Sequence, residues 1–320
     1  MSARTAVVGI GQTAFSWSSG RSEATLAAEA VRNALDDAGL TVADVDGVVR
    51  FSGESTSASE LVALMDMRPL SFTADEGTGG AFAPALLGLA DLAISSGRAR
   101  VVVAFRAFNG RSMRRLGRPA LATLAGDDMV IKAGGTSPIG GEFSGPYGLL
   151  APAHVFALWT RAYIERFGIS EARMRQALEA VVVTERGYAC KNPAALLREK
   201  PMTATEYVLS PMIADPLRRA DICLESDGAC AIVLAAPEVA ADCRQRPVYL
   251  LGTTQAIIPG YHQLFLMEET LPPRVPQLPL ESQFRLLGLS INDVDMLGLY
   301  DAASCCVIFD VESLGICGPG

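Results

Sequence analysis

The stretch DAGLTVADVDGVVRF at residues 37–51 decides the fold, because it recurs as LLGLSINDVDMLGLY at residues 286–300. The two copies share five identical residues at a single offset of 249 positions. In the first copy these are Gly39, Leu40, Asp44, Val45 and Asp46. Identity at one offset, in segments with the same expected local structure, indicates an internal repeat. The sequence therefore predicts two homologous α/β halves, with a long insertion in the first.

Around the first copy, apolar strand-like stretches alternate with amphipathic helical ones. The patterns predict strands at 5–10, 45–49, 100–105 and 226–236, and helices at 22–38, 57–65 and 79–97. Ser22 is suited to cap the first of these helices, and Gly39 is suited to stop it. Such alternation is typical of a mainly parallel sheet covered by helices on both faces.

The alternation breaks at residues 107–153, which are rich in glycine and proline, and helices are predicted again at 154–167 and 171–186. A further strand is predicted within PVYLLGTTQ at 247–255. We therefore expect an N-terminal half at 1–106 and 226–240, an inserted region at 107–225, and a C-terminal half at 246–320. The second half lacks counterparts of 79–106 and 226–236, so we expect the chain to be incomplete at its C-terminus or to be covered there by a partner.

Composition narrows the functional class. Half of the residues are hydrophobic and the net charge is −8, which argues against a nucleic-acid-binding protein. No apolar run is long enough to span a bilayer, and no signal peptide is visible, so we expect a cytoplasmic protein without a membrane span. With only two histidines, a histidine-rich metal site is impossible and a classical zinc site is not expected. We predict neither a metal nor a cofactor.

The phrase TERGYACKNPAALLREKPMTATEYVLSPMIADPLRRADICLESDGA at 184–229 resembles the thiolase superfamily, and most closely the lipid-transfer-protein or sterol-carrier-protein-type thiolases. It contains an NP helix end, an SP.I..PL...D segment and an SDGA strand in that order. The resemblance implies a thiolase-like α/β fold. In that fold two βαβαβαββ-type halves form an αβαβα layered arrangement, of which the second half is apparently incomplete here.

Two departures from the thiolase pattern concern the chemistry. Thiolases carry a nucleophilic cysteine where the 79–97 helix begins, but this chain has glycine at about Gly80 and no cysteine before Cys190. This excludes a cysteine-linked acyl-enzyme on that helix, and Gly79 and Gly80 would instead let a ligand approach the backbone. In LYDAASCC at 299–306, Tyr300 stands where catalytic members of this branch carry a histidine.

The two departures together resemble one subgroup, the lipid-transfer-protein-like aldolases of bacterial steroid side-chain degradation. VVVAFRAFNGRS at 101–112 and FSGPYGLLAPAHVFALWTRAYIERFG at 143–168 are similar to the same subgroup. The resemblance implies retro-aldol cleavage of a steroid β-hydroxyacyl-CoA, with a 17-hydroxy, C22-type side chain, to a 17-ketosteroid and propionyl-CoA. It also implies an acyl-CoA-binding partner protein with an OB-fold and a zinc ribbon, and a homodimer within a heterotetramer. Strand 100–105 would form the dimer edge.

Retro-aldol cleavage needs a group that takes the hydroxyl proton and a group that stabilises and protonates the thioester enolate. A tyrosine near its ordinary pKa of about 10 is a poor base but a good proton relay. We therefore assign Tyr300 as the catalytic relay and Asp301 as the residue that orients it. A packed core position for Tyr300 and a helix N-cap role for Asp301 are the alternatives.

Other candidates are weaker. Tyr147 and His262 are possible substrate contacts, although a structural role suits His262 better, and Arg114 and Arg115 could bind CoA phosphates. A subunit interface or a solvated loop would explain the arginines equally well. Two other functions remain open on the sequence alone. One is a non-catalytic acyl-CoA- or lipid-binding thiolase-like protein, and the other is a thiolase-like acyl-CoA enzyme with different thioester chemistry.

Overall fold

The computed structural model describes residues 5–53, 55–76, 83–114, 147–149, 151–255, 277–318 and 320. The chain divides into two compact units. Unit 1 comprises 1–115 and 225–254, and unit 2 comprises 116–224 and 255–320. Each unit has a hydrophobic core of its own.

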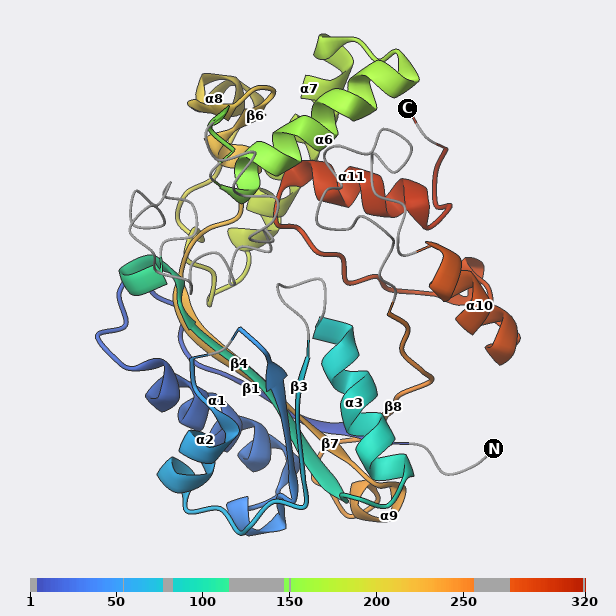
Figure 1. The fold of residues 1–320 in the computed structure, drawn as a ribbon. Coiled ribbons are helices and arrows are strands. Elements are labelled where there is room, and N and C mark those ends of the chain that lie inside the picture. The colour runs from blue at the N-terminus through green and yellow to red at the C-terminus, as the bar shows by residue number, and fades with distance from the viewer. Residues whose placement is uncertain are drawn as a thin grey trace. The chain divides into compact units, whose positions relative to one another are not determined.

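Among the described residues, unit 1 is built on a six-stranded sheet of order β3-β2-β4-β7-β1-β8 (Figure 1). The strands are β1 (Ala6–Gln12), β2 (Gly47–Phe51), β3 (Phe72–Glu76), β4 (Val101–Asn109), β7 (Asp227–Ala235) and β8 (Val248–Tyr249). Strands and helices alternate from β1 to β4, and β7 follows after the excursion through unit 2. This is the βαβαβαββ order predicted for the first half.

The direction of the strands differs from the prediction in two ways. The sheet is mixed, because β7 runs antiparallel to both β4 and β1, and β8 runs antiparallel to β1. The expected mainly parallel sheet is therefore wrong. The expectation that strand 100–105 forms a dimer edge is also wrong, because β4 lies between β2 and β7. A strand that pairs on both sides has no free backbone groups for a further strand.

Helices cover both faces of this sheet, α1 and α2 on one side and α3 on the other (Figure 1). Alternate residues of β4 supply the two cores: Val101 and Val103 pack toward α1, whereas Val102 and Ala104 pack toward α3. This is the period-two alternation of a strand buried on both faces. The helices and short turns of this unit are α1 (Glu23–Ala38), η1 (Val42–Asp44), α2 (Ala58–Met65), α3 (Ala83–Ser95), the π-helix η3 (Gly110–Arg114) and α9 (Pro237–Ala240).

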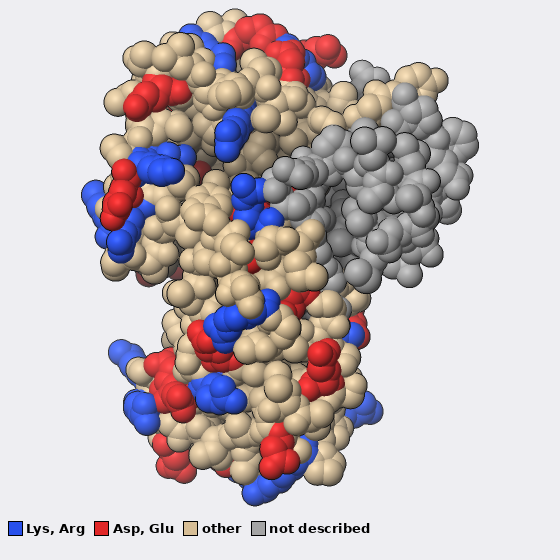
Figure 2. Space-filling model, turned by 90° about the vertical axis from the view of Figure 1, so that its left-hand side faces the viewer, with Lys and Arg blue, Asp and Glu red and all other residues tan. Residues whose placement is uncertain are grey.

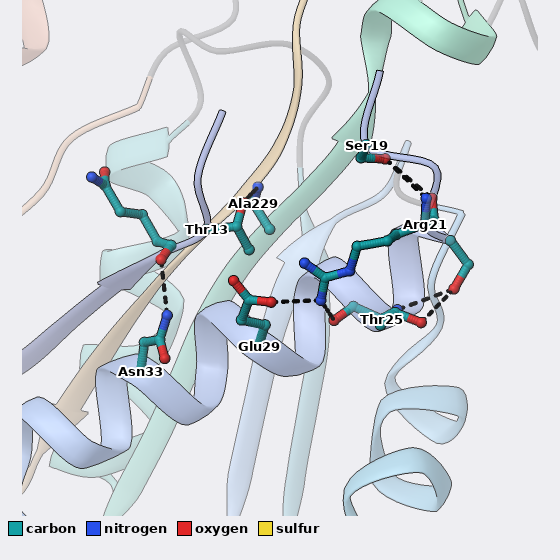
Figure 3. Close-up of polar contacts among 9 residues, drawn as sticks. Thr13, Ser19, Arg21, Thr25, Glu29, Asn33 and Ala229 are labelled. Atoms are coloured by element: carbon teal, nitrogen blue, oxygen red, sulfur yellow. Dashed lines mark hydrogen bonds and ion pairs between the residues drawn. The ribbon is translucent and has the colours of Figure 1, made fainter. Parts of the chain in front are cut away.

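Polar contacts hold the start of α1, and a further one joins α1 to β1 (Figure 3). Ser22 caps the helix as predicted, and its side chain accepts a hydrogen bond from a first-turn backbone N–H. Arg21 and Glu29 form an ion pair at 2.5 Å. The Asn33 amide donates to the carbonyl of Gln12 at 2.9 Å, which ties the middle of α1 to the end of β1.

Two glycines of β1 allow α1 to lie directly on the strand. A Cβ at Gly9 or Gly11 would fall well inside the contact distance of the carbonyl oxygens of Ala34 and Ala30 in α1. Backbone-to-backbone packing this close is a use for which glycine is suited. The strand predicted at 247–255 is shorter than expected, since only Val248 and Tyr249 pair with β1.

Unit 2 is mainly helical. Its core contains Tyr163, Met174, Leu178, Tyr207 and Phe309, which bring α6, α7, α8 and α11 together. Among the described residues, no helix of either unit has the length and apolarity needed to cross a membrane. The elements of unit 2 are α6 (Pro152–Phe167), α7 (Glu171–Ala189), α8 (Ala204–Leu209), β5 (Met212–Ala214), β6 (Leu217–Arg218), η6 (Arg219–Asp221), α10 (Gln277–Leu287), η9 (Ile291–Asp293) and α11 (Ser304–Ser313).

The two copies of the repeat have the same local structure at their start. Gly39 follows α1 with φ 76° and Gly288 follows α10 with φ 67°, so both helices end in a left-handed glycine. Each copy continues into a 3₁₀ turn closed by a capping box, η1 in the first and η9 in the second. The copies then differ: 47–51 form β2, whereas 296–300 form no strand. Within the described residues, β2 lies between β3 and β4 in the sheet, whereas 296–300 belong to no sheet.

Candidate active site

Tyr300 and Asp301 lie immediately before α11, the helix that follows the second copy of the repeat. Tyr300 is 44% exposed, so the packed core position considered for it is wrong. Asp301 is exposed as well. The N-cap role for Asp301 is also wrong, because α11 begins at Ser304 and its N-cap residue is Ala303.

Asp310 of α11 holds the backbone of Tyr300. The Tyr300 N–H donates a hydrogen bond to the Asp310 carboxylate. Burial raises the pKa of Asp310 from 3.8 to about 6, against the opposing effect of that hydrogen bond. The position of the Tyr300 backbone therefore depends on an acid that titrates in the mildly acidic range.

A second acid, Glu185 of α7, lies within reach of the negative charge of Asp301. Its pKa is raised from 4.5 to about 7, first by desolvation and then by the negative charge of Asp301. A carboxyl group poised near neutrality is suited to exchange protons at physiological pH. Asp310 thus bonds the backbone of Tyr300, and the charge of the neighbouring Asp301 acts on Glu185.

Glu185 and Asp310 are not among the residues predicted from the sequence. The sequence contains a signal for Asp310 but none for the position of Glu185. Asp310 follows Cys306 by four positions, which places an acid on the helix face that buries Cys306. Glu185 belongs to the 184–229 phrase that carries the thiolase resemblance, but nothing in the sequence places it near Asp301, 116 positions later.

The arginine-rich start of the insertion lies in unit 1, where β4 passes into η3. The guanidinium of Arg106 stacks on Phe51 and Phe108, with 4.9 and 5.4 Å to the ring centroids. The backbone N–H groups of Arg111 and Ser112 donate to the buried carboxylate of Asp227, each at 3.0 Å.

Asp227, the aspartate of the SDGA motif, is the anchor of this turn. Its carboxylate also accepts from the backbone N–H of Ser19 at 2.9 Å. Burial opposes ionisation of Asp227, but the hydrogen bonds from Ser112, Ser19 and Arg111 hold its pKa below the ordinary value. The SDGA motif therefore fixes the start of the arginine-rich segment in place.

Several predicted site residues fall outside this description. Gly79, Gly80, His262 and Arg115 lie outside the described residues, and the side chain of Arg114 does as well. Tyr147 is described and is 92% exposed. In the part of the chain that the structure describes, no three acidic, histidine or cysteine side chains gather as a metal site would require.

Charges are mixed on the face of the molecule that Figure 2 shows. Figure 2 shows basic and acidic side chains interspersed on one face, with no extended patch of a single sign on its described surface. On this face a charged ligand would therefore be bound by individual charged side chains and not by an extended surface potential of one sign.

No protein-family model matches the chain. The chain is 35% identical over 322 residues to a 17-hydroxy-3-oxo-4-pregnene-20-carboxyl-CoA lyase of Mycobacterium tuberculosis, covering 100% of this chain and 81% of the relative. It is 33% identical to a steroid side-chain-cleaving aldolase of Thermomonospora curvata, covering 98% of this chain and 78% of the relative. The chain belongs to the steroid side-chain-cleaving aldolase family.

Solved structures agree with this family and with the thiolase-like fold. A structure described as an Ltp2-ChsH2(DUF35) aldolase matches with a TM-score of 0.82 and 31% identity, over 98% of this chain and 77% of that one. A monomeric SCP2-thiolase-like protein of Mycobacterium smegmatis matches with a TM-score of 0.73 at 20% identity, over 98% of this chain and 64% of that one, which concerns the fold alone. The predicted thiolase-like α/β fold and the predicted resemblance to the aldolases are confirmed.

Proposed function

We propose that this aldolase cleaves a steroid β-hydroxyacyl-CoA with a 17-hydroxy, C22-type side chain by a retro-aldol reaction. The hydroxyl proton leaves, its O–H electron pair forms the C17 ketone, and the C17–C20 bond breaks toward the thioester. The enolate that results takes up a proton and departs as propionyl-CoA. The observation that carries this proposal is the near-full-length similarity to two relatives named for this class of reaction.

The residues before α11 suit this chemistry. Tyr300 is 44% exposed, and its backbone is held by Asp310. We assign Tyr300 as the relay that moves the proton at the substrate hydroxyl or at the enolate, and Asp301 as the group that orients it. We assign Glu185, whose pKa is raised to about 7, as the group that accepts or returns the relayed proton.

We further propose that the protein binds its acyl-CoA substrate together with a partner that has an OB-fold and a zinc ribbon, as two copies of each chain. The similar structure described as an Ltp2-ChsH2(DUF35) aldolase supports a partner of this kind. Arg114 and Arg115 are the proposed contacts to CoA phosphates. Tyr147, Gly79, Gly80 and His262 are the proposed contacts to the rest of the substrate.

Replacing Tyr300 tests the assigned chemistry. In the complex with the partner, Tyr300→Phe should lower kcat for release of the 17-ketosteroid and propionyl-CoA by about 100-fold or more, the usual effect of removing a proton-transfer group. Substrate binding should persist, because the aromatic ring is retained. Both products are measured by chromatography.

Tyr188→Phe is the matched control, since Tyr188 is an exposed tyrosine of α7 outside the assigned site. An unchanged rate for Tyr300→Phe would show that the role assigned to Tyr300 is wrong. A parent complex that binds the acyl-CoA but releases neither product would instead favour the non-catalytic binding protein.

A further inference from the structure

The segment that carries Tyr300 is held in place by a second stretch of unit 2, residues 221–223. Ile222 pairs with Ala303 in an isolated antiparallel bridge. The N–H of Cys223 donates to the carbonyl of Ala302 at 3.1 Å. The Asp221 carboxylate accepts a hydrogen bond from the hydroxyl of Ser304 at 2.6 Å. Three successive residues, 221–223, thus contact Ala302, Ala303 and Ser304, the residues that follow Asp301.

Asp221 is the centre of a buried polar network. It is 3% exposed. Both of its oxygens lie 3.1 Å from the donating hydroxyl of Tyr207, and one also accepts the Arg218 N–H at 2.6 Å. Burial raises the pKa of Asp221 against the opposing effect of these bonds. Burying a carboxylate costs free energy unless hydrogen bonds satisfy its oxygens. We therefore infer that Asp221 contributes by fixing the geometry of the groups bonded to it.

The network around Asp221 affects the position of Tyr300, because the segment from Tyr300 to Ser304 is short and is hydrogen-bonded at both ends. Asp310 bonds the Tyr300 backbone at one end, and Asp221 bonds Ser304 at the other. Ala302 and Ala303 between them are 5% and 0% exposed. A segment held at both ends has few ways to turn its first side chain.

We propose that Asp221 is a positioning residue that acts through Ser304 and the start of α11 to aim the phenol of Tyr300 at the substrate. This rests on the proposed function, in which Tyr300 relays the proton. Asp221 is the aspartate of the SP.I..PL...D segment, so that segment has a role in catalysis without contacting the substrate. Proton transfer is sensitive to such aiming, since a displacement of about 1 Å can lower a rate about 100-fold.

A double-substitution cycle between Ser304 and Tyr300 tests this, with single-turnover assays of the complex. Ser304→Ala should lower the cleavage rate about tenfold with KM changed less than about twofold, as expected when a transition-state contact is misplaced. In the Tyr300→Phe background, Ser304→Ala should produce no further loss. Ser313→Ala is the matched control: Ser304 and Ser313 lie in the same helix and are each 3% exposed, but the hydroxyl of Ser313 bonds the Asp310 carbonyl instead.

Two further measurements keep the test decisive. Asp221→Asn retains an acceptor for Ser304 and should keep more activity than Asp221→Ala. With 3-fluorotyrosine at position 300, Ser304→Ala should shift or broaden the fluorine resonance, and Ser313→Ala should not. This readout needs no residual activity.

The outcomes separate the two proposals. An equal loss from Ser304→Ala in both backgrounds, or no loss and no change in the fluorine resonance, would overturn the positioning role. A parental rate for Tyr300→Phe would overturn the proposed role of Tyr300 itself, whatever Ser304→Ala does. If Asp221→Ala does not fold, the Ser304 variants carry the test alone.

Discussion

Asp310 is partly buried and accepts a hydrogen bond from the backbone of Tyr300. Burial raises the pKa of its carboxyl group, and the hydrogen bond lowers it. Burial dominates, so the pKa is raised from 3.8 to about 6. Between about pH 4 and 6 the folded state therefore binds more protons than the unfolded state, and the free energy of unfolding falls as the pH rises through that window. The parent protein consequently carries a penalty at pH 8 that it does not carry at pH 4.

Asp310→Asn should remove that penalty while keeping an oxygen acceptor for the Tyr300 N–H. The variant should melt a few degrees above the parent at pH 8, and this difference should disappear at about pH 4. Thermal melts at the two pH values measure it. Asp293→Asn is the control with the opposite sign, because bonds from Ser290 lower the pKa of Asp293. A gap between Asp310→Asn and the parent that is the same at both pH values would contradict the raised pKa.

At the scale of elements, the sequence predicts best what local interactions decide. Ser22 and Gly39 bound α1 as expected, because a cap and a left-handed stop are properties of neighbouring residues. The mixed sheet was not predicted, because an apolar strand pattern does not encode the direction in which a neighbouring strand runs. The stretch 296–300 aligns with β2 in the repeat but forms no strand, since strand formation also depends on neighbouring strands.

In the candidate site, too, local sequence motifs could be recognised, whereas contacts between distant residues could not. Tyr300 could be found from its motif. Its supports could not, because Asp221 accepts a hydrogen bond from Ser304 across 83 positions and the charge of Asp301 acts on Glu185 of α7. Contacts of this kind come from packing in unit 2, for which single-sequence patterns have no signal.

The close packing of α1 on β1 gives a prediction at the same scale. Gly9→Ala should lower the free energy of unfolding by about 1–3 kcal/mol, the usual range for overpacking, because its Cβ would meet the Ala34 carbonyl of α1. Gly53→Ala, where nothing lies within 4 Å of the added Cβ, is the control and should change stability little. Denaturant titrations compare the two. Equal stability of both variants would mean that α1 can move away from β1 without cost.

At the scale of the whole molecule, the sheet of unit 1 must be considered at its two edges. Among the described strands these are β8, with two residues, and β3, with five. A strand such as β3 leaves one side of its backbone open to a further strand. Beside it lies an open hollow lined by Arg50, Thr73 and Asp75, in which the arginine and the aspartate form an ion pair at 2.5 Å. With β4 excluded as an edge, β3 is where we expect the proposed homodimer to form.

Adding a positive charge to β3 tests whether the homodimer forms through this strand. A twofold contact through β3 brings each exposed Thr73 close to the same residue of the second copy, so Thr73→Lys would place like charges together. We expect the parent to have the mass of a dimer by light scattering, and Thr73→Lys to shift it toward the monomer, with partial recovery at high salt because salt screens the repulsion. Ser95→Lys, at the exposed end of α3, adds the same charge away from the edge and should leave the dimer intact. A monomeric parent, or a Thr73→Lys dimer as stable as that of Ser95→Lys, would rule out assembly through β3.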